Sequence, residues 1–243
     1  MTDTEPGGTQ PNAADDAGRL WCGRFDAVLS TLSQAEPGYP FGSVVPYCLD
    51  QGGRPLLLLS HLAQHSHNLA ADSRCAFTVF DGAGGDVQQS RRLTCTADCE
   101  AANDALDLAR YCRHFPRGQA YVRELGFRLF RLLPRRFHYN GGFATARWLG
   151  ADRLLPPSPF AAGAEAQLLA SLRADHGDWL DRYRAVGTDA PVQPIGIDRW
   201  GLTVHDGARL LRLESPTPMD GPPTLRAAIE ADALRPVTSA SIG

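Results

Sequence analysis

The chain has 243 residues, 43% of them hydrophobic, so it is long and apolar enough to bury the core of one large or two small domains. Its formal net charge of −3 gives no general attraction to nucleic acid or anionic membranes, and we expect neither as a partner. All 24 cationic side chains are arginine, which excludes a Schiff-base lysine and the lysine of a P-loop. Any anionic ligand must therefore be held by arginines, backbone amides or helix N-termini.

The first 17 residues are rich in Gly, Pro, Asp and Thr, a composition typical of a disordered tail. They contain no apolar run, so we expect neither a signal peptide nor a membrane anchor. The six cysteines form no CxxC pair, and several lie in apolar runs, which favours buried free thiols over a metal site. A reducing cytoplasm fits these features best.

Short apolar or alternating runs separated by turn residues predict a series of β-strands in the next part of the chain. The expected strands are residues 28–32, 42–49, 56–60, 75–80, 92–100, 127–133 and 137–149. Turn residues at 50–54 predict a hairpin between the second and third strands, and the last two strands look paired with each other. A helical stretch over residues 103–125 has a break at Pro116. Many short strands with few helices between them argue for a barrel.

A proline-rich stretch at residues 155–159 marks the expected domain boundary. After it, leucines at helical spacing predict a helix over residues 164–185. Three short strands are expected at residues 192–198, 201–204 and 210–213, and a last helix at residues 223–234. These elements predict a second, smaller unit of helices and strands.

The stretch SHLAQHSHNLAAD, residues 60–72, places three histidines directly after an apolar strand. His61 and His65 would share one face of a helix, which allows a metal site. However, no Glu accompanies them in the HExxH manner, and His67 would point away from both. An ordinary amphipathic helix explains the stretch as well, and so does a segment beside a ligand pocket.

The order of elements and several local motifs resemble the FMN-binding split-barrel superfamily, and within it the HugZ/HutZ-type haem-utilisation family. The motifs are FGSVVPY at 41–47, LSHLAQH at 59–65 with Asn68 and Leu69, RLT at 92–94, FRLFRL at 127–132, and GGFA at 141–144 followed by Trp148. The resemblance implies an α+β fold, with a split-barrel domain over residues 18–155 and a small C-terminal α/β domain over residues 160–236. Relatives in the superfamily form homodimers with the ligand in the subunit interface, so we expect a homodimer.

The same resemblance implies where a ligand would lie. In the superfamily the segment after the barrel hairpin borders the cofactor pocket, so Ser60, His65 and Asn68 are expected to line it. A short helix directly after a strand also offers free N–H groups and a favourable dipole to a phosphate or carboxylate. Arg92, at the start of a later strand, would add a bidentate charge for the same anion.

For function, the resemblance implies a haem-binding protein of haem-iron utilisation, with oxidative haem degradation as the activity in question. His138 is the first candidate for the haem iron ligand and Arg136 for a haem carboxylate, because they lie together in an aromatic and cationic strand. His65 and His176 are weaker candidates. Some family members take a ligand histidine from the C-terminal tail, and this tail, RPVTSASIG, has none.

Two other hypotheses remain open. An FMN-dependent oxidoreductase of the pyridoxamine-phosphate-oxidase-like type would use Ser60 and Arg92 at the flavin phosphate. A non-enzymatic binding or regulatory protein would use the pocket and the C-terminal domain as partner surfaces. The fold alone does not choose among these, and the sequence does not identify an electron donor.

Overall fold

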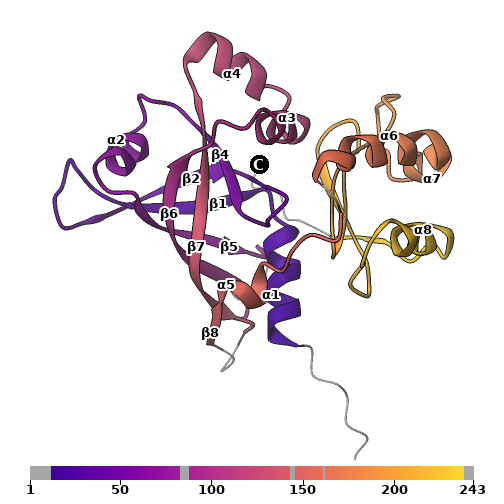
Figure 1. The fold of residues 1–243 in the computed structure, drawn as a ribbon, viewed down its shortest axis with the longest axis horizontal. Helices are drawn as coiled ribbons and strands as arrows, with labels where there is room; N and C mark the ends of the chain where they lie inside the picture. The colour runs from indigo at the N-terminus through magenta and orange to yellow at the C-terminus, as the bar shows by residue number, and fades with distance from the viewer. Residues whose placement is uncertain (1–11, 83–87, 143–145, 161, 238–243) are drawn as a thin grey trace, which may run out of the picture.

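The computed structural model describes residues 12–82, 88–142, 146–160 and 162–237, which form two antiparallel sheets with their helices (Figure 1). The strands of the first sheet are β1 (Asp26–Leu32), β2 (Pro40–Pro46), β3 (Cys48–Leu49), β4 (Pro55–Leu59), β5 (Arg74–Phe80), β6 (Arg92–Ala101), β7 (Arg128–Asn140) and β8 (Arg147–Gly150). They run in the order β2-β1-β5-β6-β7-β4-β3, with β8 beside β7, and curl into a half-barrel. The expected α+β split-barrel fold is confirmed.

Helix α1 (Ala13–Cys22) fills the core of the half-barrel. Its Asn12 cap accepts a hydrogen bond from the Ala14 N–H, and the indole of Trp21 meets Phe77 and Phe137 edge-on at ring distances of 5.8 and 5.1 Å. The first five residues of the helix, 13–17, belong to the segment expected as a disordered tail. Residues 1–11 of that segment lie outside the described part of the chain.

The expected pair of strands at residues 127–133 and 137–149 is wrong, because most of it is one strand. Strand β7 continues through Pro134, where its register with β6 shifts between Thr96 and Ala97. A proline can lie inside a sheet at such an irregularity, where no regular ladder hydrogen bond is required of its missing N–H. The short β8 then pairs with the second half of β7.

The expected hairpin around residues 50–54 is present as β3 and β4, and the leucine run of β4 is buried on both faces. Leu57 and Leu59 face the core that contains Trp21. Leu56 and Leu58 face a second cluster beneath α3 (Ala105–His114). A strand covered on both sides shows a continuous apolar run instead of alternation. The other helices of this unit are α2 (Gln64–Ala71), α4 (Gly118–Leu125) and α5 (Ala151–Leu154).

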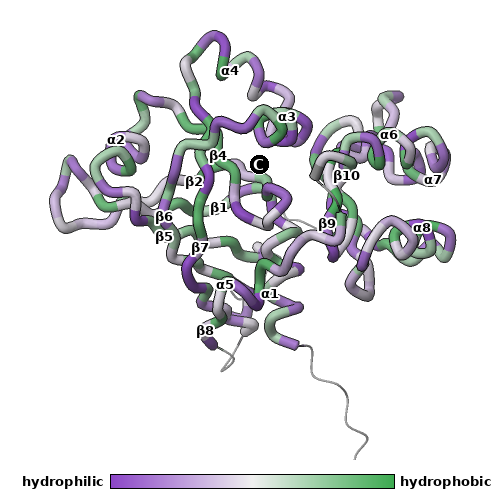
Figure 2. The backbone as a smooth tube through the Cα atoms, in the orientation of Figure 1, coloured by the Kyte–Doolittle hydropathy of each residue, from purple (hydrophilic) through white to green (hydrophobic). Residues whose placement is uncertain are grey.

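The second unit has a four-stranded sheet, and Figure 2 shows hydrophobic stretches in its strands and helices. Its elements are η1 (Ala162–Ala164), α6 (Glu165–Asp175), α7 (Gly177–Asp181), β9 (Gln193–Asp198), β10 (Gly201–His205), β11 (Leu210–Glu214), α8 (Pro222–Glu230) and β12 (Arg235–Pro236). The helix expected over 164–185 is interrupted at His176, where the Arg173 guanidinium donates a hydrogen bond to the Gly177 carbonyl. A separate apolar core lies inside this unit, and we propose that the two cores mark the two expected domains.

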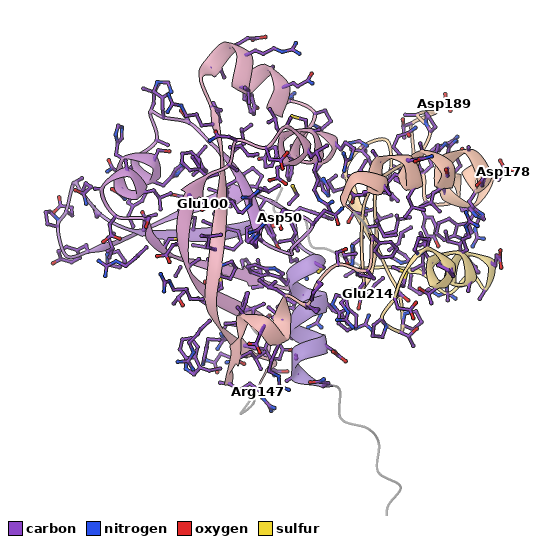
Figure 3. The ribbon with its side chains drawn as sticks, viewed as in Figure 1. Asp50, Glu100, Arg147, Asp178, Asp189 and Glu214 are labelled. Carbon is purple, nitrogen blue, oxygen red and sulfur yellow. The ribbon has the colours of Figure 1, made fainter. Side chains whose placement is uncertain are left out.

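Charged side chains join the two units. Glu165 accepts hydrogen bonds from Arg110 at 2.5 Å and from Arg113 at 2.7 Å, and Arg19 of α1 is paired with Glu214. Figure 3 shows Glu214 on the side of the second unit that faces α1, and Asp50 on the facing side of the first. The guanidinium of Arg19 also lies 4.5 Å from the Trp200 ring.

Candidate functional site

The outer face of the large sheet is a broad surface built from aligned side chains. Along each strand one set of residues points into the core, so the alternate set points outward. Direct register partners form one row across six strands: Val44, Val28, Thr78, Thr94, His138 and Trp148. The sheet therefore carries His138 and Trp148 at one end of a row whose centre is made of threonines.

The neighbouring row makes this face hollow. Its members are Gly42, Ser30, Ala76, Thr96, Arg136 and Gly150, most of them small. Ser30, Ala76 and Thr96 form part of the floor of a hollow of about 870 Å³. Its rim carries Arg74 and Arg135, paired with Asp72 and Asp98. The volume lies within the range of about 300–1,000 Å³ typical of small-molecule sites.

His138, Arg136 and Arg92 lie together on this face. The half-buried imidazole of His138 lies 5.0 Å from the Trp148 ring, and the Arg136 guanidinium lies 4.8 Å from the same ring. Arg92 is the register partner of Asn140, next on this face after the His138 pair. The arrangement offers an imidazole, two cationic groups and an exposed indole to a planar anionic ligand.

Trp148 is a site residue that was not expected from the sequence. It is 53% exposed, which is unusual for so large an apolar ring, and it contacts both outward-facing candidates of β7. The available signal was the alternation of Arg136 and His138 on one strand, followed by a strand that places Trp148 on the same face.

Ser60, His65 and Asn68 gather at helix α2. The hydroxyl of Ser60 accepts a hydrogen bond from the Leu62 N–H at 3.2 Å. Asn68 is fully buried: its amide donates to Thr31 at 2.9 Å, and its oxygen accepts from the Gln34 N–H and the Gln64 amide, both at 2.9 Å. These bonds occupy both polar atoms of Asn68. The side chain therefore anchors α2 to β1, and any role in a ligand site is indirect.

Of these three residues, His65 has a polar atom without a hydrogen-bond partner in the described part of the chain. Its Nδ1 lies 3.2 Å from the Ser43 hydroxyl of β2, while its Nε2 is buried and has no hydrogen-bond partner among the described residues. Burial lowers the pKa of the imidazole, so the neutral form is favoured. A buried ring nitrogen without a partner is costly in the free protein, and a ligand atom that paired with it would remove this cost.

A metal centre built from the histidine cluster is not supported. His61 lies outside α2, and both His61 and His67 are exposed. No group of three or more His, Cys, Asp or Glu side chains suited to a metal ion occurs within the described ranges. All six cysteines are free thiols, but only Cys48, Cys75 and Cys95 are buried as expected, and the other three are half-buried. Burial raises the pKa of Cys48, Cys75 and Cys99 to about 12.

The predicted site residues thus fall into two groups. Arg92, Arg136 and His138 share the outer face of β6 and β7, whereas Ser60, His65 and Asn68 surround α2, beside β1 and β2. Three strands, β1, β5 and β6, separate β2 from β7 in the sheet. The structure therefore contains two candidate sites where the sequence analysis treated the cofactor-binding residues as one set.

The sequence model of the family described as CREG, beta-barrel matches residues 9–147. The chain is 30% identical over 128 residues to the chloroplastic heme oxygenase HOZ of Arabidopsis thaliana. This match covers 51% of the present chain and only 39% of the length of that curated relative.

Solved structures extend the likeness over both units. A heme binding protein from Mycobacterium smegmatis is 26% identical, with a TM-score of 0.56, covering 93% of this chain and 97% of that one. A protein of unknown function from Agrobacterium tumefaciens has a TM-score of 0.72 at 22% identity, over 94% of this chain and 98% of its own, and this likeness shows the fold alone. These comparisons confirm the resemblance expected from the sequence. No described helix is long and apolar enough to cross a membrane.

Proposed function

This chain belongs to the CREG beta-barrel family, and on that premise we propose that it is a haem-binding protein of haem-iron utilisation. Two of its relatives are called a heme oxygenase and a heme binding protein. We propose oxidative haem degradation as its activity. Six free thiols fit a protein that works in a reducing compartment such as the cytoplasm.

The observation that carries this proposal is the placement of His138, Arg136 and Arg92 on one face of the sheet, beside a large hollow. Haem needs an axial ligand for its iron, a flat apolar surface against its porphyrin ring, and cations for its two propionates. His138 would supply the ligand, and the two arginines would pair with the carboxylates. Bound haem would supply iron for oxygen chemistry, while the residues of this chain bind and orient it.

We also propose that the protein is a homodimer with its ligand between the subunits. The outward row exposes 67% of Val44 and 53% of Trp148, and a broad face with such side chains is suited to association. A second copy over this face would enclose the hollow and remove a bound ligand from water.

FMN is the second candidate, and the observation that favours it is the buried, unpartnered Nε2 of His65. A flavin phosphate near α2 could accept a hydrogen bond from that nitrogen and from the hydroxyl group of Ser60, while the hydroxyl of Ser43 donates to Nδ1 of the same imidazole. This site and the haem site use different residues, so variants can separate them.

The test is an absorption titration of the purified protein with hemin, and separately with FMN. We expect a sharp Soret band that saturates at one haem per chain and is lost or shifted in His138→Ala. The matched control is His67→Ala, which removes an exposed histidine of α2 and should change nothing.

Each other outcome decides between the candidates. A saturating Soret band that is unchanged in His138→Ala would refute this ligand assignment. A flavin spectrum that depends on His65, without saturable haem binding, would support the FMN enzyme. Absence of both spectra would refute both cofactors and favour a non-enzymatic binding protein.

A further inference from the structure

A second, smaller cavity is lined by residues of both units, and Figure 1 shows α1, which contributes to its wall, on the side of the first unit that faces the second. Its walls include Trp21 of α1, the β3–β4 turn and Arg110 of α3 from the first unit. The proline-rich linker and the β9–β10 turn, with Arg199 and Trp200, complete it from the other side. The cavity measures about 60 Å³. One water needs about 10–15 Å³, so a molecule of several non-hydrogen atoms fits.

The carboxylates around this cavity already have cationic partners. Asp50 is paired with Arg54 at 2.7 Å and with Arg131 at 3.0 Å. Asp198 accepts hydrogen bonds from both terminal nitrogens of Arg212, at 2.6 and 2.7 Å. Neither carboxylate is therefore available to neutralise a further guanidinium.

Acidic side chains only partly neutralise the two arginines that line the cavity. Glu165 alone is shared by Arg110 and Arg113, and Arg199 makes no ion pair with any residue that the structure describes. At the cavity itself, Arg110 therefore shares its one carboxylate with Arg113, and the Arg199 guanidinium lies against the Trp200 ring, at 5.1 Å, which leaves a local excess of positive charge in a partly closed space. Such an excess is stabilised by a bound anion.

Two buried side-chain atoms without partners support the same inference. The Nε atoms of Arg110 and Arg199 are both buried and lack hydrogen-bond acceptors within the described part of the chain. Both arginines line this cavity, and Arg110 is only 7% exposed. Buried N–H groups of charged side chains normally find an acceptor, so the two arginines that line this cavity each retain hydrogen-bonding capacity that a ligand would use.

We propose that this cavity binds a small oxyanion, the carboxylate of a short organic acid or a phosphate group, between Arg110 and Arg199. The apolar walls of Trp21, Trp200 and the linker prolines suit a compact organic body attached to that anion. Because its walls come from both units, the ligand bridges them and stabilises their association. This site is separate from the proposed cofactor sites and does not depend on them.

The experiment is thermal unfolding of the full chain in Tris chloride, with added sodium propionate, sodium phosphate or sodium chloride at equal ionic strength. We expect a saturable rise in Tm with propionate or phosphate, of about 3–6 °C at ten times the dissociation constant, and no such rise with chloride. The preferred anion identifies the carboxylate or the phosphate as the ligand group. Trp21 and Trp200 line the cavity, so the tryptophan fluorescence of the unmodified protein should change with the same midpoint.

Two variants test the assignment. Arg199→Ala should abolish the saturable response, whereas Arg226→Ala, which removes an exposed arginine of α8, should retain it. A response that persists in Arg199→Ala, or that disappears in Arg226→Ala, would overturn the proposal. So would a wild-type protein whose Tm and fluorescence follow ionic strength alone, because the cavity would then hold only water.

Discussion

Removal of the Glu165 carboxylate should destabilise the whole chain, because this one side chain links both units. Its Oε2 accepts from Arg110 and Arg113 of α3, and its Oε1 lies 3.4 Å from the Ile197 N–H of β9. Glu165 is 4% exposed and Arg110 is 7% exposed, so Glu165→Ala would leave a buried cation without its partner. Breaking such a pair costs about 3–5 kcal/mol, and Glu165→Gln, which keeps one acceptor oxygen, should lose about half as much.

The assay is urea unfolding followed by circular dichroism and tryptophan fluorescence, in a buffer free of phosphate and carboxylates. Glu230→Ala is the matched control, since it removes an exposed glutamate of α8 and should change stability by less than about 0.5 kcal/mol. Loss of the link could also separate the two probes into two transitions. If Glu165→Ala unfolds within about 0.5 kcal/mol of the control, the ion pair does not stabilise the junction and the reasoning is refuted.

Three further predictions concern single side chains. Asn68→Ala should lower the unfolding free energy by about 2–4 kcal/mol, since it removes the three hydrogen bonds of a fully buried side chain; an unchanged denaturant midpoint would contradict this. Trp21→Ala should cost about 3–5 kcal/mol in the same measurement, because the indole fills the barrel core, and a smaller loss would mean that α1 is not part of that core. Burial, aided by the Arg110, Arg113 and Arg212 charges, lowers the pKa of His114 to about 3, so the unfolded chain takes up this proton first as the pH falls. The stability contributed by neutral His114 is therefore complete above about pH 6.5 and is lost below it, by about 2 kcal/mol between pH 6.5 and pH 5. The difference between the unfolding free energies measured in urea at pH 6.5 and pH 5 should be smaller in His114→Gln than in the unmodified protein. An equal difference in both proteins would mean that another group causes the pH dependence.

Local patterns predicted the strands best where a strand has one buried face. The alternation of Leu93, Cys95 and Ala97 matches the buried positions of β6, and the apolar run of β4 is explained by apolar cover on both sides. The sequence could not reveal that β7 continues through Pro134. That continuation depends on the register shift opposite, between Thr96 and Ala97, which is a property of two strands together.

Helix α1 was missed for a related reason. Its first six residues, AADDAG, are small or acidic, and composition alone makes them resemble a tail. Its stability comes from tertiary packing of Trp21 and Leu20, together with the Asn12 cap, and not from helix propensity. For the sites, the sequence identified suitable residue types, but only the strand register shows that His138 lies beside Trp148 and far from α2 in the sheet order.

The position of Trp21 has a consequence for synthesis on the ribosome. Trp21 leaves the ribosome early, yet its ring partner Phe137 is made 116 residues later. The centre of the barrel therefore cannot close while only the first half of the chain has emerged, and contacts of such long separation are slow to form. Until then the indole and the leucines of β4 are exposed to other chains, which is when this protein should depend most on chaperones.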